Sequence, residues 1–180
     1  FSACSEPVFL VKMTHASIHF LIGQLALKSE DGEKYTTAVK ILAMMCWCLE
    51  SRVLIQTKEF CSLIVRIILR NLHPSSVLYL TNSLYYLCLE YSKPEELLAI
   101  DVLTALTKIH DMEVSGATDA NTSIEINQNL CEIIRALCTT AETATKCATA
   151  ANIQIMNRAL TTSGSHAATV YNVAVSLTKR

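Results

Sequence analysis

Internal repetition is the feature of this sequence that most narrows the folds it can adopt. Three five-residue segments align on one another and a shorter fourth continues the series, at 45–49, 85–89, 135–139 and 171–174. The steps from Cys48 to Cys88, from Cys88 to Cys138 and from Cys138 to Ala174 are 40, 50 and 36 residues. The stretch 113–122 has loop composition, and removing about ten residues there restores a period near 40. That period is typical of a two- or three-helix repeat.

The aligned columns make physical sense as equivalent helices. Two apolar columns, three residues apart, predict the buried stripe of each helix: Trp47, Leu87, Leu137 and Val173, and Met44, Leu84, Ile134 and Val170. The Cys column is small, as expected where neighbouring helices approach closely. We therefore expect Cys48, Cys88 and Cys138 to be buried free thiols. Coincidence is the alternative, because the chain has eight cysteines.

Composition favours long helices. Glycine and proline number only four and three in 180 residues, which leaves few turn signals for an all-β fold. Apolar residues make up 51% and charged residues 17%, which excludes disorder. Apolar periodicity and end signals predict an all-α fold with helices over 14–28, 37–50, 56–71 and 75–90. They further predict a left-handed Gly32 after the first helix, a fifth helix from Lys93 capped by Ser92, and a loop over 113–122.

The C-terminal third resembles the armadillo repeat, a superhelical stack of helix triplets, and its HEAT relatives. The segment from Lys146 to Leu160 looks like the junction of that family's first two helices, with Asn152 where the family usually has Gly. The segment from Ala167 to Ala174 is similar to its third helix, with Asn172 as the groove asparagine. The resemblance covers about 37–180, is sharpest over 123–180, and leaves a HEAT-like or irregular repeat as the alternative. It implies a right-handed superhelical stack with approximate repeats at 1–35, 36–73, 74–112, 123–163 and, in part, 164–180.

Charge, hydropathy and cysteine placement bear on where such a chain works. Since Phe1 opens without a Met and Arg180 directly follows a helical pattern, we expect 1–180 to be one helical-repeat segment of a longer chain. The net charge of -1 gives no phosphate-binding footprint, so no nucleic-acid partner is expected. The longest apolar run, 41–49, is about half of the roughly 20 residues that membrane insertion needs. Cysteines inside helical patterns favour a reducing, intracellular site, cytoplasmic or alternatively nuclear, over secretion with paired disulfides.

No motif predicts catalysis or a cofactor. The chain lacks a Gly-rich phosphate loop, a nucleophile elbow and paired carboxylates in an apolar setting. His15 and His19, four residues apart on a helix, can place two imidazoles on one metal, but further ligands are missing nearby and an ordinary helix surface is expected. Cys46 and Cys48 point to different helix faces, which favours core packing. An enzyme remains the third alternative, because the following residues could meet in space: Cys61, Cys147, His73, His110 and His166.

The remaining polar columns predict a binding face. If the equivalent helices line one wall of the stack, seven residues form a strip along it: Asn82, Tyr85, Tyr86, Glu132, Arg135, Tyr171 and Asn172. Tyr and Arg are enriched in binding hot spots. The alternative is that the tyrosines only pack against neighbouring helices. The sequence thus favours a non-catalytic scaffold or adaptor that binds a protein or peptide, with a structural subunit of a large assembly as the second class.

Overall fold

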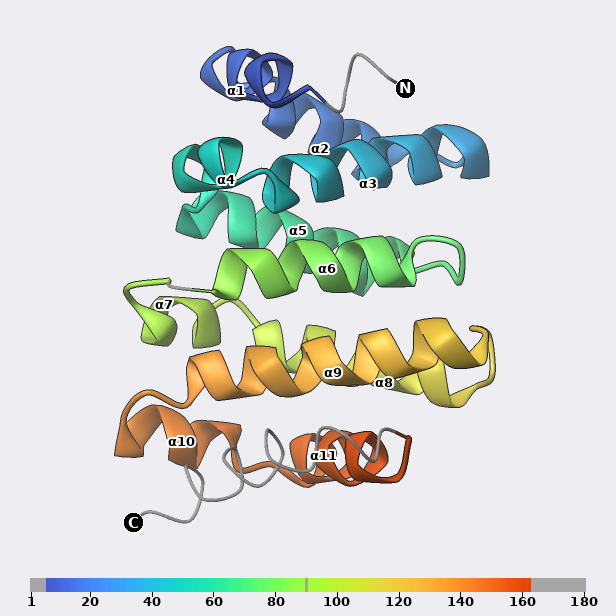
Figure 1. Ribbon diagram of the computed structural model, residues 1–180, viewed down its shortest axis with the longest axis vertical. Helices are drawn as coiled ribbons and strands as arrows, with labels where there is room; N and C mark the ends of the chain where they lie inside the picture. The colour runs from blue at the N-terminus through green and yellow to red at the C-terminus, as the bar shows by residue number, and fades with distance from the viewer. Residues whose placement is uncertain (1–5, 90, 163–180) are drawn as a thin grey trace. The chain divides into compact units, whose positions relative to one another are not determined.

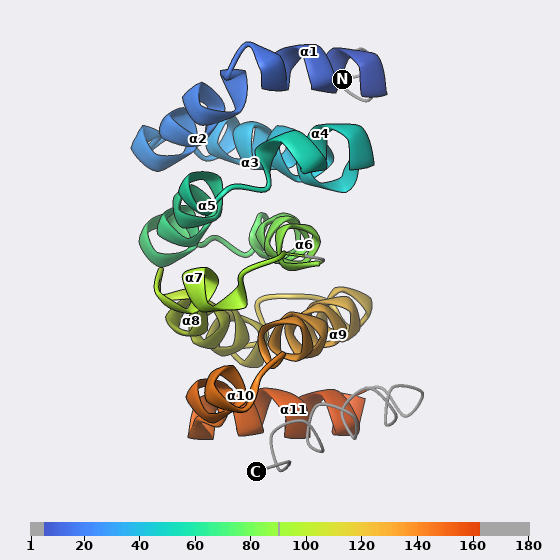
Figure 2. The same cartoon turned by 90° about the vertical axis from the view of Figure 1, so that its left-hand side faces the viewer.

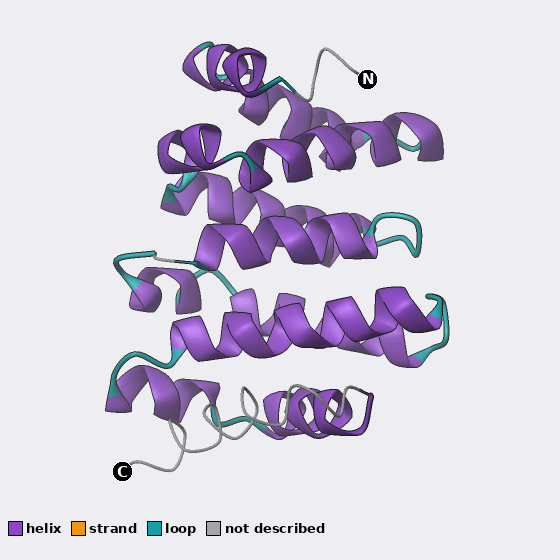
Figure 3. Ribbon diagram, viewed as in Figure 1, coloured by secondary structure: helices purple, strands orange, loops and turns teal. Residues whose placement is uncertain are grey.

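The computed structural model describes residues 6–89 and 91–162, and every regular element in them is an α-helix (Figure 1, Figure 3). The predicted all-α class is therefore confirmed for this part of the chain. In chain order the helices are α1 (Pro7–His15), α2 (Ile18–Lys28), α3 (Gly32–Trp47), α4 (Leu49–Ile55), α5 (Lys58–Asn71), α6 (Val77–Cys88), α7 (Pro94–Leu98), α8 (Val102–Val114), α9 (Ala120–Leu137), α10 (Ala141–Cys147) and α11 (Ala150–Thr162).

Contacts group the chain into two compact units, residues 1–87 and 88–180. In the first unit α1 packs on α4, and α2 packs on both α3 and α5 (Figure 2). In the second unit α7 packs on α10, α8 packs on α11, and α9 contacts all four of these helices. The two units therefore share a pattern in which the first helix contacts the fourth and the second contacts the fifth. The pairs are α1 with α4 and α2 with α5 in the first unit, and α7 with α10 and α8 with α11 in the second.

Several helix ends follow the predicted signals and others do not. α2 ends at Lys28 and α5 ends at Asn71, as predicted. Gly32 does not end a helix. It begins α3, because the Asp31 carboxylate accepts hydrogen bonds from the backbone N–H groups of Glu33 and Lys34 at 3.0 and 3.3 Å.

Later in the chain two further helix starts differ from the prediction. α7 begins at Pro94, but its N-cap position is Lys93, without a side-chain bond, rather than Ser92. α9 begins at Ala120 under an Asp119 cap, so the loop before it spans only 115–119 rather than 113–122. The shorter loop follows from the Asp119 side chain, which accepts from two backbone N–H groups of the first turn.

Two left-handed residues turn the chain between a short helix and the next. Ser17 (φ 56°) stands between α1 and α2 and divides the helix predicted over 14–28, and Asp101 (φ 59°) stands between α7 and α8. Asn152, which the resemblance places at a junction of this kind, does not turn the chain. It lies inside α11, buried, and its Nδ2 donates to the Cys147 carbonyl at 2.7 Å.

The buried faces of α6 and α9 correspond at the predicted spacing of 50 residues. The matched buried pairs are Ser76/Ile126, Val77/Asn127, Leu80/Leu130, Thr81/Cys131, Ser83/Ile133, Leu84/Ile134 and Leu87/Leu137. At α3 the predicted apolar column fails, because Trp47 is exposed whereas Leu87 and Leu137 are fully buried.

The contact of α2 with α5 depends on one glycine. A Cβ placed on Gly23 would lie 2.3 Å from Cδ2 and 2.9 Å from Cγ of Leu63, so an Ala there forces Leu63 to move. We expect Gly23→Ala to lower the free energy of unfolding by about 1–2 kcal/mol, because overpacking outweighs the better helix propensity of Ala. Urea unfolding followed by circular dichroism measures this. Gly32→Ala is the matched control, since a Cβ there meets nothing within 4 Å. An equal loss in both variants would contradict the packing argument.

Candidate functional site

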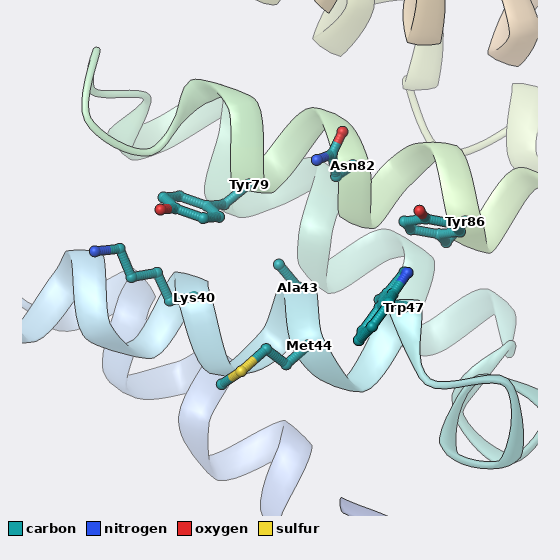
Figure 4. Close-up of a pocket in the computed structure, with 7 residues that line it drawn as sticks. All are labelled: Lys40, Ala43, Met44, Trp47, Tyr79, Asn82 and Tyr86. Atoms are coloured by element: carbon teal, nitrogen blue, oxygen red, sulfur yellow. The ribbon is translucent and has the colours of Figure 1, made fainter. Parts of the chain in front are cut away.

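A groove in the first unit lies between α3 and α6 (Figure 4). Helix α3 lines it at helical spacing with Lys40, Ala43, Met44 and Trp47, and α6 does so with Tyr79, Asn82 and Tyr86. Its volume of about 520 Å³ falls within the range of sites that hold a small molecule or a few side chains of a partner. Four of the seven lining residues carry an aromatic ring or a thioether, namely Trp47, Tyr79, Tyr86 and Met44.

Hydrogen bonds in the first unit fix where α6 lies. At its start, Ser76 Oγ donates to the Tyr35 hydroxyl at 3.3 Å, and that hydroxyl donates to the carbonyl of Asn71 at the end of α5. At its end, Gln56 Nε2 donates to the Leu87 carbonyl at 2.8 Å. Tyr35 is itself a buried residue of α3. Both ends of α6 are therefore tied to other residues of the first unit, which holds its aromatic stripe opposite α3.

Two cations lie on the tyrosine rings of this groove. Lys40 Nζ is 5.3 Å from the centroid of the Tyr79 ring, and Cζ of Arg52, on α4, is 5.6 Å from that of Tyr86. Figure 4 shows Lys40 opposite Tyr79 and Trp47 opposite Tyr86. Cation–π contacts of this kind stabilise by about 0.5–1 kcal/mol at exposed sites. They hold the positive charges against the aromatic wall.

Trp47 is the clearest disagreement between the expected and the observed site. It was predicted to be part of a buried column, yet 66% of its surface is exposed. Met44, predicted in the second apolar column, is half-buried and also lines the groove. The sequence reasoning therefore missed Lys40, Trp47 and Tyr79 as site residues. The signal was present, because residues 40, 44 and 47 and residues 79, 82 and 86 each have the spacing of one helix face.

The structure describes five of the seven residues of the predicted binding strip. Asn82 and Tyr86 line the groove, and the Tyr85 ring lies beside that of Tyr86 with centroids 5.0 Å apart. Glu132 and Arg135 lie on α9 in the second unit, where Arg135 Nε pairs with Glu132 Oε2 at 2.7 Å. The last two members, 171 and 172, lie outside the described residues. A strip continuous over all seven residues stays a prediction.

The two histidines considered for a metal have different surroundings. His15 is exposed, whereas His19 is buried against Phe20 and Phe60, with ring centroids 4.4 and 5.2 Å away. Burial lowers the pKa of His19, so it remains neutral down to a lower pH than a free histidine. Within residues 6–89 and 91–162 no three His, Cys, Asp or Glu side chains are grouped to hold a metal ion.

The cysteines of the described residues are free thiols. Cys48 and Cys88 are buried, as predicted, and Cys138 is half-buried. Burial raises the pKa of Cys61, one of the nucleophile candidates, to about 12, which disfavours the reactive thiolate. A hydrogen bond between Cys138 and Cys147 lowers the pKa of the first and raises that of the second.

The other candidates for a nucleophilic pair lie in unlike surroundings. His73 is exposed and packs edge-on to the Tyr35 ring, whereas His110 is buried and its pKa is lowered by burial. Residue 166 lies outside the described part of the chain.

Among the described helices none is long and apolar enough to cross a membrane by itself, although α1 and α2, bent by 85°, meet that test as a pair. Comparison of the chain with protein-family models, curated proteins and solved structures gave no match.

Proposed function

We propose that this chain is a non-catalytic protein-interaction scaffold or adaptor, built as a stack of armadillo- or HEAT-like helical repeats, that binds a peptide segment of its partner in the α3–α6 groove. The observation that carries the proposal is the open groove in which an exposed Trp47 lies opposite Tyr86 and Tyr79 lines the other end (Figure 4). Exposed tryptophan is rare on surfaces that meet only water, and Trp and Tyr are the residues most enriched in binding hot spots.

Three observations support a stack of repeats. In each unit the first helix contacts the fourth and the second helix contacts the fifth. The buried faces of α6 and α9 correspond residue by residue. Ser17 and Asp101, both left-handed, turn the chain at equivalent junctions of two successive helices. A solenoid of this kind presents equivalent helices along one face, which is the surface such proteins use for binding.

The groove has the chemistry of a peptide site. Trp47 and the tyrosines offer apolar faces with polar tips, so they contact side chains and still hydrogen-bond. Asn82 adds an amide side chain to the lining. Met44 adapts its shape to different side chains.

Truncating the aromatic residues tests the proposal. A library of displayed 12-residue peptides is selected on the folded chain, and the affinity of the enriched peptides is measured by titration calorimetry. We expect Trp47→Ala and Tyr86→Ala each to weaken binding by about 1–4 kcal/mol, five- to several-hundred-fold, because each removes a large contact surface.

Leu21→Ala is the matched control, since Leu21 is an exposed apolar residue of α2 that does not line the groove. Circular dichroism of each variant checks the fold. Unchanged affinity in both aromatic variants would place the interface elsewhere. Loss of helix in either would show that the aromatic residue belongs to the core.

A structural subunit of a large assembly is the second candidate. Large apolar residues are exposed on α1 and α4, two helices that contact each other: Val8, Phe9, Leu49, Val53 and Leu54. Exposed apolar side chains gathered on adjacent helices are typical of a surface that another subunit covers permanently. Light scattering separates the two classes, because an adaptor remains monomeric at micromolar concentration whereas a subunit without its neighbours self-associates.

A further inference from the structure

We infer that the α3–α6 groove selects acidic peptide segments, in which an Asp or Glu stands next to an apolar side chain. This inference rests on the proposed function, because it names the class of peptide that the same groove binds. It follows from the charge of the groove, from the way its cations are held, and from the apolar surface between them.

Among the described residues, those that line the groove carry a positive charge and no acid. Lys40 is the one charged residue among the seven that line it, and Arg52 stands against Tyr86 at its end. The acidic residues of the first unit's described part all lie off the lining: Glu6, Glu30, Asp31, Glu33, Glu50 and Glu59. Ion pairs among the described residues engage Lys34, Lys93, Arg135, Lys146 and Arg158. Lys40 and Arg52 pair with no described carboxylate.

The two cations are held in place for an incoming anion. A tyrosine ring covers one side of each charge, at 5.3 Å for Lys40 and 5.6 Å for Arg52, and leaves the remaining N–H donors for a ligand. Contact with the ring restricts these long side chains before binding, which lowers the entropy lost when a carboxylate pairs with them. Charge-assisted bonds of this type are stronger than neutral ones.

Apolar surface separates the cations. Ala43, Met44 and Trp47 occupy the α3 side of the groove, and the Lys40 end is two helical turns from the Trp47 end. A peptide with an acid at one or both ends of a short apolar segment therefore matches both features. A basic peptide would bring like charges onto Lys40 and Arg52, which is unfavourable. A single-stranded nucleic acid also stacks on aromatic rings, but it needs a basic track that two cations do not form.

The same displayed peptide library provides the test. We expect the enriched sequences to be rich in Asp and Glu beside Leu, Ile or Phe. The best peptide is then compared with its amide version, in which every Asp is Asn and every Glu is Gln. Because Trp47 is the only tryptophan of the chain and lines the groove, its fluorescence reports occupancy directly. The amide version should bind about tenfold more weakly, and raising the salt concentration should weaken only the acidic peptide.

Charge variants locate the effect. Lys40→Glu should weaken the acidic peptide about tenfold or more, because it replaces attraction by repulsion. Lys34→Glu, the same change on the same helix away from the groove, should leave affinity within about twofold.

Each other outcome decides against a stated part of the inference. Neutral or basic peptides whose binding needs Trp47 would overturn the acidic preference while the proposed function stands. Peptides that bind equally to wild type and Trp47→Ala would overturn both. A 12-residue uridine oligonucleotide that quenches Trp47 more tightly than any peptide would also overturn both, in favour of a nucleic-acid site.

Discussion

Phe60→Ala should lower the free energy of unfolding of the first unit by about 3–5 kcal/mol, the largest effect we expect from one substitution. The Phe60 side chain on α5 is fully buried and meets two rings of α2 edge-on, with centroids 5.2 Å from His19 and 6.0 Å from Phe20. Truncation removes both aromatic contacts and leaves a cavity that close-packed helices fill only in part. Urea unfolding followed by circular dichroism measures the loss.

Two further variants separate cavity formation from other causes. Phe60→Leu keeps most of the volume and should lower the free energy of unfolding by under about 1.5 kcal/mol. Phe9→Ala removes a ring that is 42% exposed on α1 and should change it by about 0.5 kcal/mol or less. Hydrogen exchange should rise first at the amides of α2 and α5 in Phe60→Ala. A uniform rise over the chain, or equal losses at Phe9 and Phe60, would contradict this account of the core.

Arg158→Leu should lower the free energy of unfolding of the second unit by about 2 kcal/mol. Glu113 on α8 has a side chain only 1% exposed, and its Oε1 accepts from Arg158 Nη2 of α11 at 3.2 Å and from the Ser123 hydroxyl of α9. Without Arg158 a buried carboxylate keeps only the hydroxyl. Breaking a fully buried pair costs about 3–5 kcal/mol, and the value is smaller here because Arg158 is 42% exposed and water screens it.

The effect should be asymmetric. Glu113→Leu removes the buried charge and leaves a guanidinium that is already 42% exposed, so the loss should be under about 1 kcal/mol, and Arg158→Leu should then add little to it. A double-mutant cycle in urea measures the coupling. Lys146→Leu, which breaks an exposed pair with Glu142, should have no measurable effect. Equal losses for the two single changes at the Glu113–Arg158 pair would show that the carboxylate is not stranded by the loss of its partner.

The helical class and many helix ends could be predicted from local signals. The His73–Pro74 pair ends α5 because a residue before proline is pushed out of the helical region, and Lys93–Pro94 starts α7 because proline suits the first turn. The correspondence of Leu84 with Ile134 was likewise visible, since an apolar stripe repeats with the helix period.

Errors arose where one residue type fits two roles. Gly32 suits both the end of a helix and the start of the next, and the Asp31 side chain decides between them. Ser17 interrupts an otherwise continuous apolar periodicity through a left-handed backbone, which periodicity does not report. Only the path of the chain through α1 and α2 reveals that break.

By itself the sequence determined that this chain forms helices and which stripe of α6 and α9 is buried, because both depend on residues within one or two turns of each other. The tertiary structure alone decided that Trp47 is exposed. A large aromatic residue at a helix end fits the apolar periodicity whether or not a neighbouring helix covers it. Whether Trp47 is covered depends on where α6 lies relative to α3. The bonds that set this position, from Ser76 to Tyr35 and from Gln56 to Leu87, join residues more than 30 apart in the chain. The groove and its two cations therefore exist only after the first unit has packed.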